Sequence, residues 1–323
     1  MKFIARKPGP FQFSLERLRE GFFAKYFDFE VVEAPCASAG LIGKLRILLW
    51  AFRFRDSRVH LLGDVHFLTW VLKKGWYSQT VHDVEVVQRS KGLKRWILSE
   101  IWFKGAINRS AITICISEQT KRSILKEISG VNPQKLCVIH NPFIARTSKS
   151  GLVSKEFDVI TIGSKSNKNL RWLASAIEDT GVRWLAVGQE MEILQEVQGK
   201  NVNLTIKEKL SDEELVLMFQ SSKLLVMASE SEGFGVPILE AQFLGIPVVC
   251  SDIPVFREVA GKGAYFVPLN SRNQLKSTII DVLTGENKPS DVVQLGLRNL
   301  QRFQPEFIAS EYNRALKRLT SLS

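Results

Sequence analysis

The chain has 323 residues, of which 45% are hydrophobic, and its formal net charge at neutral pH is +11. This length and hydrophobic content suffice to bury the cores of two domains of roughly 150 residues each, which excludes a disordered or fibrous protein. No run approaches the roughly 20 apolar residues needed to span a bilayer, and the first residues lack an apolar signal core, so we expect a cytoplasmic protein.

The excess positive charge lies in the first half of the chain. Residues 1–147 hold 24 Lys and Arg against 12 Asp and Glu, a net charge of +12, whereas residues 148–323 hold 20 against 21, a net charge of −1. A basic balance is typical of proteins that meet nucleic acid, an anionic membrane surface or an anionic substrate. Four scattered cysteines have no paired spacing for zinc or redox chemistry, which favours buried thiols in a reducing compartment.

Short apolar runs alternate with longer helical segments through the first half, and this alternation predicts a parallel α/β sheet. The runs are Lys2–Ala5, Glu30–Ala34, Val59–Leu62, Gln79–Val81, Ala111–Ile116 and Leu136–Ile139. Open parallel sheets bind ligands at the carboxyl ends of their strands, so the residues after each run are candidates for a site. Gly9 and Pro10 follow the first run, and His82 and Asp83 follow the fourth. The imidazole of His82 can hydrogen-bond a ligand, and the alternative is a bond to local backbone.

Two segments of the first half, Leu41–Arg58 and Lys91–Lys104, interleave aromatic and branched side chains with cations. Basic aromatic helices can lie on anionic lipid, where each cation contributes on the order of 1 kcal/mol. The alternative is an ordinary amphipathic helix packed on a sheet. The charge of the whole half favours peripheral contact with the inner face of the cytoplasmic membrane. Nucleic acid is not expected as a partner, because no recognised binding motif accompanies the charge.

A break in both periodicities predicts a linker near residues 143–155, between a domain of residues 1–147 and a second of residues 148–304. The second domain repeats the alternation of strand and helix. Its predicted strands are Phe157–Ile162, Trp184–Val187, Val202–Ile206, Lys223–Met227, Val248–Cys250 and Ala264–Val267. Residues 305–323 have a helical pattern that predicts a packed C-terminal helix.

The loop after the first strand of this domain combines a glycine turn with lysines. Gly163, Ser164, Lys165 and Lys168 precede a helix predicted over Leu170–Ile177. Such a loop can neutralise a diphosphate, and the alternative is a solvated turn. Gly188 directly follows the second predicted strand of this domain and is a further candidate for the same site.

Residues 229–252 are the most informative segment of the chain. Glu232 and Glu240 flank a glycine loop, Gly233-Phe234-Gly235, and Val236-Pro237 follows it. Glycine permits positive φ and Pro suits the first turn of a helix, so a helix is predicted to begin near Val236. The amino end of that helix is suited to an anion, most plausibly phosphate, and Glu240 can accept hydrogen bonds from sugar hydroxyls.

Taken together, the two carboxylates eight positions apart, Gly-Phe-Gly, Pro and the following Ala-x-x-x-Gly-x-Pro-Val-Val resemble the signature of retaining glycosyltransferases of family four (glycosyl transferases group 1). The resemblance implies the GT-B fold, an α/β architecture in which two Rossmann-like domains face each other across a cleft. It also implies a UDP- or GDP-linked nucleotide-sugar donor, a glycan or lipid-linked acceptor, no cofactor and no metal. In the family the second acidic residue holds the donor ribose and the first lies near the sugar and phosphate, roles that would fall on Glu240 and Glu232.

The resemblance implies roles for other residues as well. Lys168 matches the lysine that holds the diphosphate, while Ser164 stands where the family has an arginine, so that Lys165 would substitute. His82 resembles the histidine near the donor sugar, and Gly9 and Pro10 resemble the loop that approaches the acceptor, with Asp83 beside them. In the GT-B fold the C-terminal helix often packs back on the N-terminal domain.

Two alternatives stay open at this point. One is a nucleotide-sugar epimerase or a phosphorylase on the same fold, since fold does not determine function. The other is a catalytically silent nucleotide-sugar-binding subunit that partners an active transferase, which the serine at position 164 keeps open.

Overall fold

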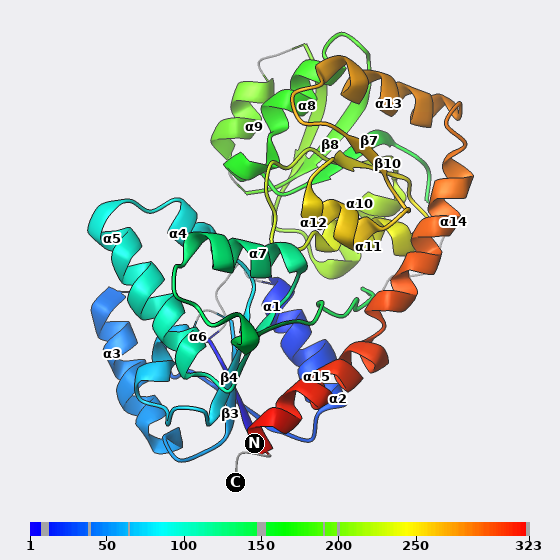
Figure 1. The fold of residues 1–323 in the computed structure, drawn as a ribbon. Helices are drawn as coiled ribbons and strands as arrows, with labels where there is room; N and C mark the ends of the chain where they lie inside the picture. The colour runs from blue at the N-terminus through cyan, green and yellow to red at the C-terminus, as the bar shows by residue number, and fades with distance from the viewer. Residues whose placement is uncertain are drawn as a thin grey trace. The chain divides into compact units, whose positions relative to one another are not determined.

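A computed structural model describes residues 1–7, 13–37, 40–63, 65–146, 153–189, 191–198 and 201–320. The chain forms two compact units, each of which contains one parallel sheet covered by helices (Figure 1). The N-terminal unit comprises residues 1–144 together with the segment that begins at Phe303. The C-terminal unit comprises Ala145–Arg302.

The sheet of the N-terminal unit has six parallel strands in the order β2-β1-β3-β4-β5-β6. Its strands are β1 (Lys2–Ala5), β2 (Glu30–Glu33), β3 (Val59–Leu62), β4 (Tyr77–Val81), β5 (Ile112–Cys115) and β6 (Leu136–Val138). The six predicted runs are therefore confirmed, with ends that shift by no more than two residues. Strands β3, β4 and β5 are buried along their whole length. Strands β3 and β5 are mostly apolar, as expected of buried parallel strands, whereas the polar side chains of β4, Ser78, Gln79 and Thr80, contact the polar side chains of His60, Thr113 and Tyr312.

Short helices connect these strands. They are α1 (Phe13–Leu18), α2 (Ala24–Tyr26), α3 (Gly40–Ala51), α4 (Glu85–Gln88), α5 (Gly92–Trp96), α6 (Gly105–Arg109) and α7 (Glu118–Glu127). Wider π-helical turns, Arg19–Phe23 (η1) and Ile97–Lys104 (η4), continue α1 and α5, and 3-10 turns lie at Phe52–Phe54 (η2), His66–Trp70 (η3) and Pro133–Lys135 (η5). Helix α7 begins after Ser117, whose Oγ accepts a hydrogen bond from the Thr120 amide at 3.0 Å.

Helix α15 (Pro305–Thr320) belongs to the N-terminal unit although it lies at the end of the sequence (Figure 1). It buries Ile308, Tyr312, Leu316 and Leu319, which recur at the helical spacing of three to four residues. Fully burying side chains of this size contributes about 1.5–3 kcal/mol each. The Tyr312 hydroxyl lies 3.2 Å from Oγ1 of Thr80 on β4, so the helix also contacts the sheet through a polar group.

The C-terminal unit has a second parallel sheet, in the order β12-β11-β10-β7-β8-β9. Its strands are β7 (Phe157–Ile162), β8 (Arg183–Val187), β9 (Asn203–Lys207), β10 (Ser222–Met227), β11 (Val248–Ser251) and β12 (Tyr265–Val267). All six match the predicted runs. The chain proceeds outward from β7 through β8 to β9 and then from β10 to β12 on the other side, so the strand order reverses between β7 and β10. In open sheets this reversal point opens a crevice beyond the carboxyl ends of the strands.

The helices of this unit cover the sheet. They are α8 (Leu170–Ile177), α9 (Met191–Gln198), α10 (Asp212–Gln220), α11 (Val236–Phe243), α12 (Pro254–Ala260), α13 (Arg272–Thr284) and α14 (Pro289–Asn299), with 3-10 turns at Ser166–Lys168 (η6) and Leu300–Phe303 (η7). Helix α10 starts with a capping box, in which Ser211 Oγ accepts from the Glu214 amide and Glu214 accepts from the Ser211 amide. Helices α8 and α11 have the starting residues that the sequence predicts.

Candidate functional site

Two loops meet beyond the carboxyl ends of β7 and β10, at the reversal point of the C-terminal sheet. The Glu230 amide donates to the carbonyl oxygen of Asn167 at 2.9 Å, and the Asn167 side chain donates to the Ser231 carbonyl oxygen at 2.8 Å. These bonds hold the lysine loop of residues 163–169 against the glutamate loop of residues 229–235. Two segments about 65 residues apart in the sequence therefore form one site.

An ion pair joins the charged residues of the two loops. Lys168 Nζ lies 2.6 Å from Glu232 Oε1, and Ser229 Oγ donates to the same oxygen at 2.7 Å. The lysine and glutamate side chains are 16% and 15% exposed, so solvent screens the pair only in part. A diphosphate that binds here must share Lys168 with Glu232 or replace that carboxylate.

The loop leads into helix α11 through a glycine that no other residue can easily replace. Gly235 has a φ of +106°, and a Cβ placed on it would lie 3.1 Å from Cε1 of Phe256. Phe234 is buried beside it, and the Gly235 carbonyl oxygen accepts from the Ile238 amide at 3.0 Å. The amino end of α11 therefore starts at the site, as the sequence predicts, with Val236 as its first residue and Gly233 in the preceding turn.

Gly188, at the end of β8, packs against Ser164. A Cβ on Gly188 would lie 2.5 Å from Cβ of Ser164, whose side chain is buried, whereas Lys165 is exposed. Gly163 has a φ of +90° and donates its amide to the Val187 carbonyl oxygen at 2.6 Å. Ser164 thus faces the interior of the loop, and Lys168 and Lys165 supply the loop's positive charge.

Glu240 has a partner that sequence reasoning missed. Arg146 Nε donates to Glu240 Oε1 at 2.6 Å, and a terminal nitrogen of the same guanidinium pairs with Asp212 at the start of α10. The Glu240 side chain is only 5% exposed. Arg146 lies in the polar stretch that interrupts both periodicities, so no pattern singled it out.

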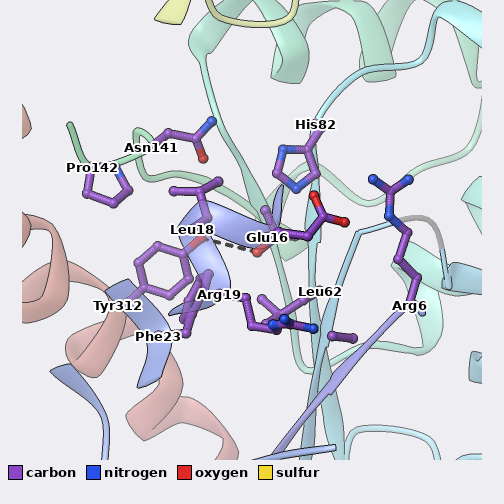
Figure 2. A pocket seen from close by; sticks show the side chains of 12 residues that line it. Arg6, Glu16, Leu18, Arg19, Phe23, Leu62, His82, Asn141, Pro142 and Tyr312 are labelled. Atoms are coloured by element: carbon purple, nitrogen blue, oxygen red, sulfur yellow. Dashed lines mark hydrogen bonds between the residues drawn. The ribbon is translucent and has the colours of Figure 1, made fainter. Parts of the chain in front are cut away.

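The N-terminal unit carries a pocket of its own at the carboxyl ends of β1, β3 and β4 (Figure 2). His82 lines this pocket, together with two groups that the sequence did not indicate, Glu16 and Arg6. Glu16 Oε2 is buried without a hydrogen-bond partner in the described part of the chain. The other lining residues are Ala5, Leu18, Arg19, Phe23, Leu62, Thr80, Asn141, Pro142 and Tyr312.

The remaining predicted residues of this unit are placed differently. Asp83 is exposed, and its Oδ1 accepts from the Glu85 amide at 3.0 Å, which caps the start of α4. It does not line the pocket. Gly9 and Pro10 lie outside the described residues.

In the described ranges no group of three or more His, Cys, Asp or Glu side chains is arranged to hold a metal ion. None of the helices in those ranges combines the length and the apolar character that crossing a bilayer requires.

Comparison with known proteins identifies a family model and a fold that this chain matches. Residues 148–296 match the family model described as "Glycosyl transferases group 1", which confirms the resemblance noted in the sequence. The O-antigen chain mannosyltransferase RfbU of Salmonella typhimurium is 26% identical over 215 residues, which cover 63% of this chain and 60% of RfbU. O-antigen chain mannosyltransferase B of Escherichia coli is 31% identical over 108 residues, 33% of this chain and 28% of that protein.

Among solved structures, HepE of Anabaena in complex with UDP-glucose superposes with a TM-score of 0.79 at 15% identity, covering 100% of both chains. This likeness and the two parallel six-stranded sheets confirm the GT-B fold. At such low identity the likeness extends to the fold alone. The chain spans three fifths or less of the length of the curated relatives named above.

Proposed function

Because residues 148–296 match the family model described as glycosyl transferases group 1, on a chain with the GT-B fold, we propose that this protein is a retaining glycosyltransferase of the hexosyltransferase class. It would move a sugar from a UDP- or GDP-linked donor to a glycan or lipid-linked acceptor in polysaccharide or glycoconjugate biosynthesis. The names of the curated relatives make a mannosyl donor the first candidate, and HepE was solved with UDP-glucose.

One observation carries the proposal: the Lys168–Glu232 pair lies directly before the amino end of α11, at the reversal point of a parallel sheet. The lysine and the helix end supply positive potential for a diphosphate, and Glu232 supplies an acceptor for sugar hydroxyls. Glu240, on the first turns of the same helix, is suited to the ribose. No other cluster of the described residues combines these three chemistries.

The same groups account for the chemical step that we propose. When the bond between the anomeric carbon and the phosphate oxygen breaks, negative charge develops on the diphosphate that leaves. The acceptor hydroxyl oxygen forms the new bond to the anomeric carbon, and its proton passes to the leaving phosphate. Lys168, Lys165 and the amino end of α11 would stabilise that charge more strongly than they stabilise the ground state. With this much positive potential from the protein itself, we propose that transfer requires no metal.

The acceptor would bind at the pocket of the N-terminal unit. His82 and Glu16 both point into it (Figure 2), and an imidazole beside a carboxylate oxygen without a partner can orient a sugar hydroxyl. Phe23 and Leu62 provide an apolar wall for the face of a sugar ring. We assign His82 a positioning role toward the acceptor.

The first experiment is a thermal-shift panel of UDP, GDP, ADP and their common sugar conjugates on the wild type and on Glu240→Ala. A ligand that binds only the folded state raises the melting temperature. We expect one base series to give a shift in the wild type that the variant loses. A matched control is Glu196→Ala, which removes an exposed carboxylate that pairs with Arg171 in the same unit. The absence of any shift would contradict the donor site, and shifts without transfer to any acceptor would favour the silent-subunit alternative.

We also propose that the protein associates peripherally with anionic membrane through a basic apolar surface on α3, η2, α5 and η4. This surface exposes eight large apolar side chains, with exposed fractions between 40% and 72%: Ile42, Leu45, Leu49, Phe52, Leu93, Trp96, Ile97 and Ile101. The two helical segments lie together, since Lys44 Nζ on α3 is 4.8 Å from the ring centroid of Trp102 on η4. Residues 40–58 and 91–104 carry nine Lys and Arg against two Asp and Glu. Apolar side chains ringed by cations fit an anionic lipid surface.

Co-sedimentation with phosphatidylglycerol vesicles tests the basic apolar surface. The fourfold variant Leu45→Ser, Leu49→Ser, Leu93→Ser and Trp96→Ser should lose most of the bound fraction. The control changes four exposed apolar residues elsewhere, Leu125, Leu295, Leu297 and Phe307, to Ser and should bind as the wild type does. Wild-type binding should weaken at high salt, because screening shortens the reach of the cations. Equal loss in both variants, or no binding by the wild type, would refute this surface.

A further inference from the structure

The guanidinium of Arg146 bridges two carboxylates of the C-terminal unit. Its Nε donates to Glu240 Oε1 at 2.6 Å, and its NH1 nitrogen pairs with Asp212. Arg146 is 13% exposed and Glu240 is 5% exposed, whereas Asp212 is 47% exposed. One buried contact therefore connects α11 to the chain that enters this unit, and a more exposed contact connects that chain to α10.

The burial of Glu240 gives the contact its physical importance. A carboxylate removed from water loses its hydration, and removing its partner leaves an uncompensated buried charge. The planar guanidinium presents its donors in fixed directions, so one nitrogen can hold Glu240 while another holds Asp212. The contact with Asp212 restrains the guanidinium in turn.

The contact is compatible with a ligand on the same carboxylate. An ionised glutamate offers about four acceptor positions, and the Arg146 Nε donor occupies one of them. Contact with Arg146 therefore does not by itself exclude hydrogen bonds from ribose hydroxyls to Glu240. A lysine at this position would supply charge without the fork.

We propose that Arg146 is a positioning residue for the donor site: it holds the Glu240 carboxylate in the orientation that receives the ribose hydroxyls, and it does not itself contact the donor. The inference rests on the proposed function, because it takes Glu240 as the ribose ligand. Arg146 lies outside the glutamate motif. Its proposed effect is confined to the affinity for the ribose of the donor.

Titration calorimetry with UDP and GDP and with their 2′,3′-dideoxy counterparts tests this role. For the base that binds, we expect the wild type to prefer the ribonucleotide by at least tenfold. Arg146→Gln should reduce that preference to less than threefold by weakening the ribonucleotide and leaving the dideoxy affinity nearly unchanged, and Glu240→Gln should do the same. Arg146→Lys should give an intermediate preference.

A control and two contrary outcomes make the test decisive. Arg171→Gln removes an arginine that pairs with Glu196 on an exposed face of the same unit and should retain the wild-type preference. If Arg146→Gln weakens both nucleotides equally or leaves the preference unchanged, the positioning role is wrong while the donor site stands. If the wild type binds neither nucleotide, the proposed function and this inference are both wrong.

Discussion

At the scale of single residues, both acidic side chains of the glutamate motif are paired with cations in the C-terminal unit. Lys168 contacts Glu232 and Arg146 contacts Glu240, each at 2.6 Å. The two ion pairs differ in whether a bound donor would compete with them. Under the proposed function, Lys168 would offer its charge to a diphosphate, so that its pair with Glu232 would compete with the ligand, whereas Arg146 would stay on Glu240 while the ribose binds.

This competition predicts opposite effects for the two members of the first pair. Lys168→Met should weaken nucleoside diphosphate binding by about tenfold or more, since a hydrogen bond to a charged group contributes about 1.5–3 kcal/mol. Glu232→Gln should leave diphosphate binding equal or tighter, because Lys168 is no longer neutralised, and should reduce sugar transfer by at least about 100-fold if Glu232 acts on the donor sugar. Calorimetry measures the first quantity and product formation the second.

A matched control exists at the amino end of β10. Lys223 Nζ lies 2.9 Å from Asp158, and Lys223→Met should leave diphosphate binding unchanged. If Glu232→Gln weakens diphosphate binding as much as Lys168→Met does, then Glu232 supports the loop and does not compete with the ligand.

The sequence indicated the candidate donor-side residues but did not indicate the residues that they contact. Three of these residues, Glu232, Glu240 and Lys168, lie close in sequence to a glycine turn and to the start of a helix. Both features have recognisable local sequence patterns, so the three residues can be identified from the sequence. Arg146 and Glu16 have no such pattern, since each reaches its partner or pocket only through the tertiary fold. The burial of Ser164 against Gly188 was not predictable for the same reason.

At the scale of elements, helix α15 is attached to the N-terminal sheet by a buried polar chain as well as by apolar packing. His60 on β3 contacts Ser78 Oγ at 2.6 Å and Thr80 Oγ1 at 2.9 Å, and Thr80 in turn contacts the Tyr312 hydroxyl. His60 is fully buried, and the ring centroids of Phe3 and Tyr312 lie 5.4 and 5.9 Å from that of its imidazole. Burial, and next the neighbouring His82, lowers the pKa of His60 to about 3.

The lowered pKa predicts a dependence of stability on pH. Unfolded, His60 has its ordinary pKa of about 6.5 and takes up a proton below it, while the folded state does not until about pH 3. The contribution of His60 to the free energy of unfolding is therefore complete above pH 6.5. It falls by about 1.4 kcal/mol per pH unit as the pH drops from 6.5 toward 3. We expect the free energy of unfolding, measured with urea, to fall between pH 7.5 and pH 5.5 by about 1.4 kcal/mol more in the wild type than in His60→Asn.

The histidine control for this measurement is His140→Asn, a change at a half-buried ring beside Phe303. It should keep the wild-type loss between the two pH values. If His60→Asn and the wild type lose the same free energy, His60 is accessible to protons in the folded protein and the buried chain does not hold α15 as described.

The elements themselves were largely predictable because their signals are local. All twelve strands appear at the predicted runs, since most of these strands are short, contain several apolar side chains and are bounded by turn residues. The helical segment 91–104 differs in kind, because it widens into π-helical turns from Ile97 onward. Such widening depends on how the segment packs, and the periodicity of a short segment does not specify it.

At the scale of the whole molecule, charge divides the chain between its two halves. The +12 of residues 1–147 accompanies the exposed apolar side chains of α3, α5 and η4, while the nearly neutral second half carries the candidate donor site. A near-neutral unit can still bind a diphosphate, because Lys168 and the amino end of α11 concentrate positive potential locally. The division is consistent with a protein that meets a lipid surface through one half and a soluble donor through the other.

The measurement that tests the central claim most directly is the transfer reaction itself. Purified protein, given the nucleotide-sugar that the thermal-shift panel selects and a lipid-linked glycan acceptor, should form a glycoside whose anomeric configuration, read by NMR, equals that of the donor. Glu232→Gln should abolish product, and Lys223→Met should not. A product of inverted configuration would contradict the retaining mechanism, and binding of the donor without any product would contradict the claim that this chain is the transferase.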